Sequence, residues 1–149
     1  MTKRNTIILI TFLSFLFSCS NPQKEKEKQT NTTFTKVANH IEVIDFYGTR
    51  RCITCKAIEK NTLYTLEKYF SDELKTGKII FKRIDVDAKD NYGIAEKFQA
   101  TGTALFLTIY KDNKENIIDI TDFAFLKGKE QEAFSNALKN RLANELKNL

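Results

Sequence analysis

Residues 45–56 read Asp-Phe-Tyr-Gly-Thr-Arg-Arg-Cys-Ile-Thr-Cys-Lys, and this stretch decides how the chain folds. Its first residues belong to a largely apolar segment, residues 41–47, that predicts a buried strand. The residues that follow the stretch have a helical pattern. Two cysteines three residues apart at such a turn are typical of dithiol redox chemistry. The first sulfur meets the unpaired N–H groups at the start of the helix, which favour a thiolate. The second lies one turn further in, close enough to form a disulfide with the first.

The order of these features resembles the active-site segment of the thioredoxin family. In that family a strand, an Asp-Phe-aromatic sequence and a short loop lead into Cys-x-x-Cys-Lys and a helix. Residues 83–87 (RIDVD) resemble the next strand of the family, and residues 94–107 resemble the short helix and strand that follow. The resemblance covers one domain, residues 37–149. It implies an α/β fold with a central mixed sheet of about four strands flanked by helices, and with a shortened N-terminal part.

Apolar periodicity and turn residues predict the individual elements. We expect strands at residues 40–47, 79–85, 104–110 and 116–120, and helices at about 52–70 with an extension at 71–75, at 91–98 and at 129–146. The last helix repeats an apolar residue at every fourth position from Phe134 to Leu146, which gives it one buried face. The other phenylalanines, including Phe123 and Phe125, are expected in the core.

The N-terminus has the pattern of an exported lipoprotein. Two basic residues precede an apolar run at residues 7–17. This run is too short to span a bilayer, which takes about 20 residues. It fits a secretory signal that covers residues 1–18. Leu16-Phe17-Ser18-Cys19 resembles the lipobox of bacterial lipoproteins, which implies cleavage before Cys19 and lipid on its sulfur. An ordinary signal peptide and an uncleaved anchor are the alternatives. Residues 19–36 are polar and predict a flexible tether.

The charge distribution and the number of cysteines limit the classes of function that are expected. The net charge is +5 and the pI about 9.0, yet residues 37–149 hold 18 basic and 17 acidic side chains, so the excess lies in the signal and the tether. Nucleic-acid binding is therefore not expected. If Cys19 carries lipid, the other two of the three cysteines remain as a lone pair. Such a pair in an exported protein can cycle between dithiol and disulfide.

The expected site contains two cysteines and an aspartate. Cys52, at the helix start, is the candidate nucleophile, and Cys55 is the resolving thiol, which we expect to be buried and less acidic. A static disulfide is the alternative. Asp45 matches the family's buried aspartate, which implies that it moves the proton of the resolving cysteine. The loop between Asp45 and Cys52 is one residue longer than in the family, and an aspartate that only ends a strand is the alternative.

Four further residues are expected to face the substrate. Arg50 and Arg51 stand where thioredoxins usually have Glu/Trp-type residues. They could lower the pKa of the Cys52 thiol, attract an anionic substrate, or lie exposed with little effect. No proline follows Pro22, so the family's cis-proline is absent, and Thr103-Ala104 takes its place. A cis bond without proline costs about 3 kcal/mol, so we expect a trans peptide there, with the Thr103 hydroxyl near the sulfurs.

Together these features predict a thiol–disulfide oxidoreductase of the bacterial cell envelope, anchored by lipid and facing the periplasm or the exterior. Its partners would be protein thiols and disulfides and a membrane electron donor or acceptor. It needs no cofactor beyond a redox-active disulfide between its two domain cysteines. No metal is expected, because zinc needs further ligands and His40 is the only histidine. One alternative is a module that binds or delivers Cu(I) through the thiolate pair. Another is an interaction platform with vestigial cysteines.

Overall fold

The computed structural model describes residues 39–149. The predicted signal segment, Cys19 and the whole of the predicted tether lie outside these residues. The described chain forms, in order, β1 (His40–Tyr47), α1 (Ile53–Tyr69), α2 (Ser71–Thr76), β2 (Ile79–Asp85), a 3-10 turn (Lys89–Asn91), α3 (Tyr92–Lys97), β3 (Ala104–Lys111), β4 (Lys114–Asp119), α4 (Thr121–Lys127) and α5 (Gln131–Lys147). None of the helices in this part of the chain is long and apolar enough to cross a bilayer.

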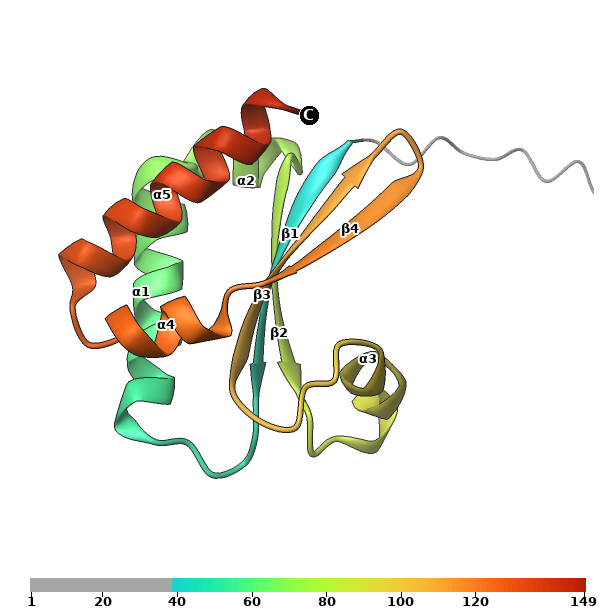
Figure 1. Cartoon of the computed structure of the whole chain (residues 1–149), viewed down its shortest axis with the longest axis vertical. Coiled ribbons are helices and arrows are strands. Elements are labelled where there is room, and N and C mark those ends of the chain that lie inside the picture. Colours follow the sequence, from blue (N-terminus) through green and yellow to red (C-terminus); the bar gives the residue numbers. More distant parts are fainter. Residues whose placement is uncertain (1–38) are drawn as a thin grey trace, which may run out of the picture. The chain divides into compact units, whose positions relative to one another are not determined.

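The strands form one mixed sheet in the order β2-β1-β3-β4. β1 pairs with β2 in parallel and with β3 antiparallel, and β3 pairs antiparallel with β4. Figure 1 shows α1, α4 and α5 on one side of the sheet and α3 on the other. This is the α/β plan with a four-stranded mixed sheet and flanking helices that the resemblance implies, and the fold prediction is confirmed.

Alternation along β1 divides the core into two clusters, because successive side chains of a strand point to opposite faces. Ile41 and Val43 pack under α1 and α5, together with residues such as Phe134 of α5. Ile44 and Phe46 face α3 on the other side of the sheet. β1 is thus buried on both faces, as expected for the central strand from which the dithiol loop leaves.

The bounds of β1 and β2 agree with the sequence prediction, whereas other boundaries differ. β4 begins two residues earlier than expected, the expected extension of the first helix is a separate helix, α2, and α5 begins at Gln131. The short helix α4 was not predicted at all. Its N-cap position, Ile120, makes no side-chain capping bond, and seven residues are too few to show a helical repeat.

The prediction that the phenylalanines of α4 lie in the core is partly wrong. Phe123 is half-buried and stacks on Phe134 with a ring-centroid distance of 5.1 Å. Phe125 is 42% exposed, because it lies on the outer side of this short helix. A helix on the surface of a core buries one face only.

A polar seam holds α1 against the segment that joins α4 to α5. The buried Asn61 side chain donates to the Gly128 carbonyl at 2.8 Å, and Thr65 donates to the Ser135 hydroxyl at 2.9 Å. A Cβ atom on Gly128 would lie 2.7 Å from the Ala124 carbonyl oxygen and 2.9 Å from Ile58, so only glycine permits this approach. The seam fixes the helix that carries both cysteines.

Candidate active site

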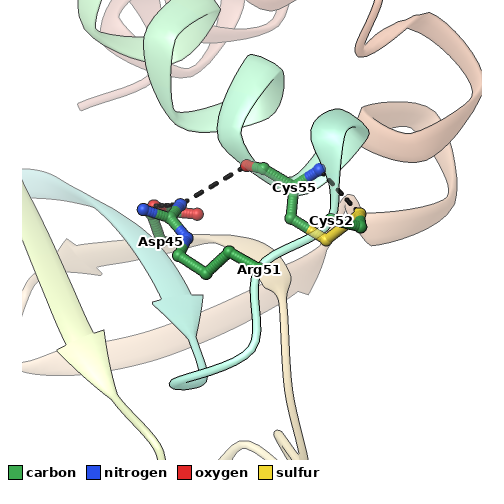
Figure 2. Close-up of a disulfide and its surroundings, with 4 residues drawn as sticks. All are labelled: Asp45, Arg51, Cys52 and Cys55. Carbon is green, nitrogen blue, oxygen red and sulfur yellow. Dashed lines mark hydrogen bonds and ion pairs between the residues drawn. A yellow bond between two sulfur atoms is a disulfide. The ribbon is translucent and has the colours of Figure 1, made fainter.

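The two domain cysteines form a disulfide at the start of α1, with their Cα atoms 5.0 Å apart (Figure 2). Cys52 is exposed, whereas Cys55 is only 8% exposed. This difference in access favours Cys52 as the sulfur that meets a partner and Cys55 as the sulfur that stays inside.

Cys52 is the N-cap of α1. Its backbone is extended (φ −72°, ψ 168°), and its sulfur accepts a hydrogen bond of 3.0 Å from the Cys55 N–H. Capping residues satisfy N–H groups that the first helical turn leaves unpaired. A negative charge on this sulfur would strengthen the same bond and would lie at the positive end of the helix dipole. The position therefore stabilises a Cys52 thiolate.

The loop before Cys52 is tied to the segment after β2. The Thr49 N–H donates to Asp87 Oδ2 at 2.7 Å, and this bond is the main reason why the pKa of Asp87 is lowered. A Cβ atom on Gly48 would lie 3.3 Å from the same oxygen, so the glycine lets the loop approach the carboxylate closely. The loop thus has a defined path next to the disulfide.

A cleft of about 510 Å³ lies beside this loop. Arg50 lines it from one side, and Thr101, Gly102 and Thr103 line it from the loop before β3. Ala104 is not among its lining residues. It begins β3, pairs with Phe46 of β1 and packs against the α3-side core. Among residues 39–149 no peptide bond is cis, as expected for the position that lacks proline.

Asp45 is fully buried on β1, on the α1 side of the sheet. Neither carboxylate oxygen has a hydrogen-bond partner in the structure. Burial is the main cause that raises the pKa of Asp45, the negative charge of Glu59 adds to this rise, and the positive charges of Arg51 and Arg83 oppose it. The net result is a pKa of about 7. Asp45 can therefore exchange a proton near neutral pH.

The side chain of Arg51 points toward Asp45, inside the protein (Figure 2). Its neighbour Arg50 is exposed. The Arg51 guanidinium forms an ion pair with Glu59 of α1 and lies 3.9 Å from Asp45 Oδ2. It also donates to the Cys55 carbonyl at 3.4 Å. The arginine that directly precedes Cys52 thus contacts the buried carboxylate and the backbone of the buried cysteine.

Glu59 and Arg83 are parts of the site that the sequence analysis missed. Glu59 forms an ion pair with Arg83, whose Nε lies 2.8 Å from Glu59 Oε1, and so bridges the two arginines. One signal was available for Glu59, since it lies four residues after Cys55 and therefore on the same face of a helix. Arg83 had no such signal, because its position opposite Asp45 depends on the β1–β2 register.

The described part of the chain contains no group of three His, Cys, Asp or Glu side chains arranged to hold a metal ion.

No protein-family model matches this sequence, and no curated protein is significantly similar to it. Among solved structures, the chain is similar to Fasciola hepatica thioredoxin, with 22% identity and a TM-score of 0.37 over 53% of this chain and 66% of that one. It is also similar to mitochondrial thioredoxin 3 of Saccharomyces cerevisiae in its oxidised form, with 26% identity and a TM-score of 0.39 over 61% and 77%. The chain thus spans just under two thirds of the Fasciola protein.

Proposed function

We propose that the protein is a thiol–disulfide oxidoreductase that acts through Cys52 and Cys55. The observation that carries this proposal is the asymmetry of the pair: an exposed sulfur caps a helix, and Arg51 links the backbone of its buried partner to a buried carboxylate without hydrogen-bond partners. Thiolate stabilisation, access and a nearby base are the three requirements of a dithiol exchange site.

In the reducing direction, the Cys52 thiolate attacks one sulfur of a substrate disulfide. This forms a Cys52–substrate disulfide and releases the other substrate sulfur as a thiolate, which takes a proton from solvent. The Cys55 thiol then gives its proton to Asp45, and its thiolate attacks Cys52 Sγ. The Cys52–Cys55 disulfide forms and the second substrate thiolate leaves, so the substrate gains the two electrons that the protein loses. The same steps in reverse oxidise a substrate dithiol.

The cleft beside the loop that leads to Cys52 suits the chain around the substrate cysteine. Arg50 and Thr103 contribute to this cleft from loops far apart in the sequence. We assign them to substrate contact, with the Arg50 charge favouring acidic residues near the substrate cysteine.

Trapping tests the proposed function. Cys55→Ala leaves Cys52 able to attack but removes the thiol that resolves the mixed disulfide. This variant should accumulate covalent adducts with protein thiols that a reductant releases, and Cys52→Ala is the matched control that should accumulate none. If neither variant forms adducts and the wild-type protein exchanges no disulfides, the proposed function is wrong.

We also propose that Cys19 carries a lipid that anchors the domain to a membrane of the bacterial cell envelope. The support is the sequence Leu16-Phe17-Ser18-Cys19 and the polar segment that follows it. A flexible tether of residues 19–36 has a mean reach on the order of 25 Å, from about 5–6 Å × √n. The dithiol would then work close to the membrane, where a membrane-bound electron donor or acceptor can reach it.

The anchor has its own test. Cys19→Ala in the full-length chain should release the protein from the membrane fraction or leave the precursor uncleaved. Unchanged membrane association would contradict lipidation. A chain that begins near Asn31 is expected to fold and to keep its dithiol activity, because the described fold begins well after Cys19.

A further inference from the structure

An ionic chain runs beneath the disulfide and ends at Asp45. Glu59 forms ion pairs with both Arg51 and Arg83, and Arg51 approaches Asp45 Oδ2 at 3.9 Å. These side chains differ in exposure: 0% for Asp45, 15% for Glu59, 16% for Arg51 and 43% for Arg83. The carboxylate is therefore the buried end of the chain, and Arg51 lies between it and Glu59.

The orientation of Arg51 is fixed from several sides. Its guanidinium carbon lies 5.0 Å from the centroid of the Tyr47 ring, and the guanidinium carbon of Arg83 lies at the same distance from that ring. One guanidinium nitrogen of Arg51 also joins Asp45 to the Cys55 carbonyl. The arginine is thus held between the acid and the resolving cysteine and is not free to turn toward solvent.

The charged groups that face Asp45 have opposing effects. Arg51 of the loop before α1 favours the ionised carboxylate, and so does Arg83, which lies opposite Asp45 on the neighbouring strand β2. Glu59 of α1 disfavours the ionised form. On the β3 side the opposite residue is the uncharged Leu105. An opposite charge at about 4–6 Å lowers the pKa of a carboxylate by about 1–3 units, and a like charge raises it. The charge of Asp45 is therefore set by its neighbours as well as by burial.

We infer that Arg51 and Glu59 are a pair of positioning residues that act on Asp45 in opposite directions and set the pH at which Cys55 resolves a mixed disulfide. The inference rests on the proposed function and deepens it. Arg51 keeps the carboxylate ionised and able to accept the Cys55 proton, and Glu59 limits this effect by sharing the arginine. Arg51 bonds the backbone of Cys55, and Glu59 is linked to the site through Arg51.

The test separates the two chemical steps in one experiment. Reduced protein is mixed with a small aromatic disulfide that releases coloured 2-nitro-5-thiobenzoate. The first release reports attack by Cys52, and the second reports resolution by Cys55. The rate of the second release is measured from about pH 5 to pH 9 for the wild type and the variants.

Arg51→Gln and Glu59→Gln should move the pH midpoint of resolution in opposite directions. Without Arg51 the midpoint should rise by about one pH unit, which slows resolution about fivefold at pH 7. Without the Glu59 charge it should fall. Arg51→Lys should restore part of the wild-type midpoint, and Lys60→Gln, which removes an exposed charge from the same helix, should leave it unchanged.

The outcomes also separate this inference from the proposed function. If the wild type shows no second release, the proposed function fails. If resolution occurs but the two variants shift its midpoint in the same direction or not at all, only the role of the pair is overturned. A purely structural role would slow both releases without moving the midpoint, and thermal unfolding of each oxidised variant checks that it is folded.

Discussion

Two buried carboxylates on the central strand, Glu42 and Asp45, have opposite surroundings. Glu42 points to the α3 side of the sheet, where it pairs with Lys82 at 2.5 Å and lies 3.6 Å from His40 Nε2. Asp45 points to the α1 side, where neither of its oxygens accepts a hydrogen bond. Burial of a charge is costly unless the charge is paired and hydrogen-bonded. The paired carboxylate therefore serves the fold, and the poorly satisfied one, next to the dithiol, remains available for proton transfer.

The largest expected effect is on catalysis. Asp45→Asn removes the base while keeping the size of the side chain, so disulfide turnover at pH 7 should fall by about 100-fold or more. Glu42→Gln, the matched change on the other face, should leave turnover close to that of the wild type. Equal losses in steady-state assays of the two variants would remove the distinction between the carboxylates.

The next effect is on the pH dependence of stability. Because the pKa of Asp45 is raised from 3.8 to about 7, the folded protein binds more protons than the unfolded chain between these values. Stability should therefore fall as the pH rises through this window and should level off above it. Relative to Asp45→Asn, the oxidised wild type should lose on the order of 3 kcal/mol between pH 4 and pH 8, since one pKa unit corresponds to about 1.4 kcal/mol.

Denaturant unfolding of both oxidised proteins at several pH values measures this difference. If the difference in unfolding free energy between the two proteins does not change with pH, Asp45 titrates normally in the folded protein. Asp45 would then not differ from Glu42 in its readiness to exchange a proton.

A smaller effect concerns the polar seam that holds α1, on the Asp45 side of the sheet, in place. Gly128→Ala places a methyl group 2.7 Å from the Ala124 carbonyl oxygen and should destabilise the fold by about 1–3 kcal/mol. Gly93→Ala, where the new methyl group meets no atom within 4 Å, is the control and should change stability little. Thermal unfolding compares the two, and a similar midpoint for both would mean that the seam tolerates displacement.

The smallest effect is expected at Glu42 itself. Glu42→Gln weakens the ion pair with Lys82, whose side chain is 42% exposed, so the free energy of unfolding should fall by only about 1 kcal/mol. A loss of several kcal/mol in denaturant titrations would show that this pair is as isolated from solvent as Asp45.

Elements with strong local patterns were predictable from the sequence. β1 and β2 are rich in apolar and β-branched residues, and their limits agree with the structure. The exposed Cys52 and buried Cys55 follow from their positions on a helix that starts at the end of a buried strand. α4 was missed because seven residues are too few to show a helical repeat, and because Ile120 at its N-cap position is not a typical capping residue.

The electrostatic part of the site depends on tertiary contacts. Nothing in the pair Arg50-Arg51 indicates that the first side chain stays exposed and the second turns inward to Asp45 and Glu59. The burial of Glu42 likewise depends on Lys82 of the neighbouring strand. Loop side chains and cross-strand partners carry no periodic signal, so this chemistry is visible only in the folded chain.

The most direct test of the account is turnover of a protein disulfide by the purified protein at pH 7, supplied with a small dithiol reductant, for the wild type and for Cys52→Ser. The account predicts that the wild type accelerates reduction well beyond the small dithiol alone and that the variant does not. A wild type no faster than Cys52→Ser would contradict it, because the exposed sulfur at the start of α1 would then have no catalytic role.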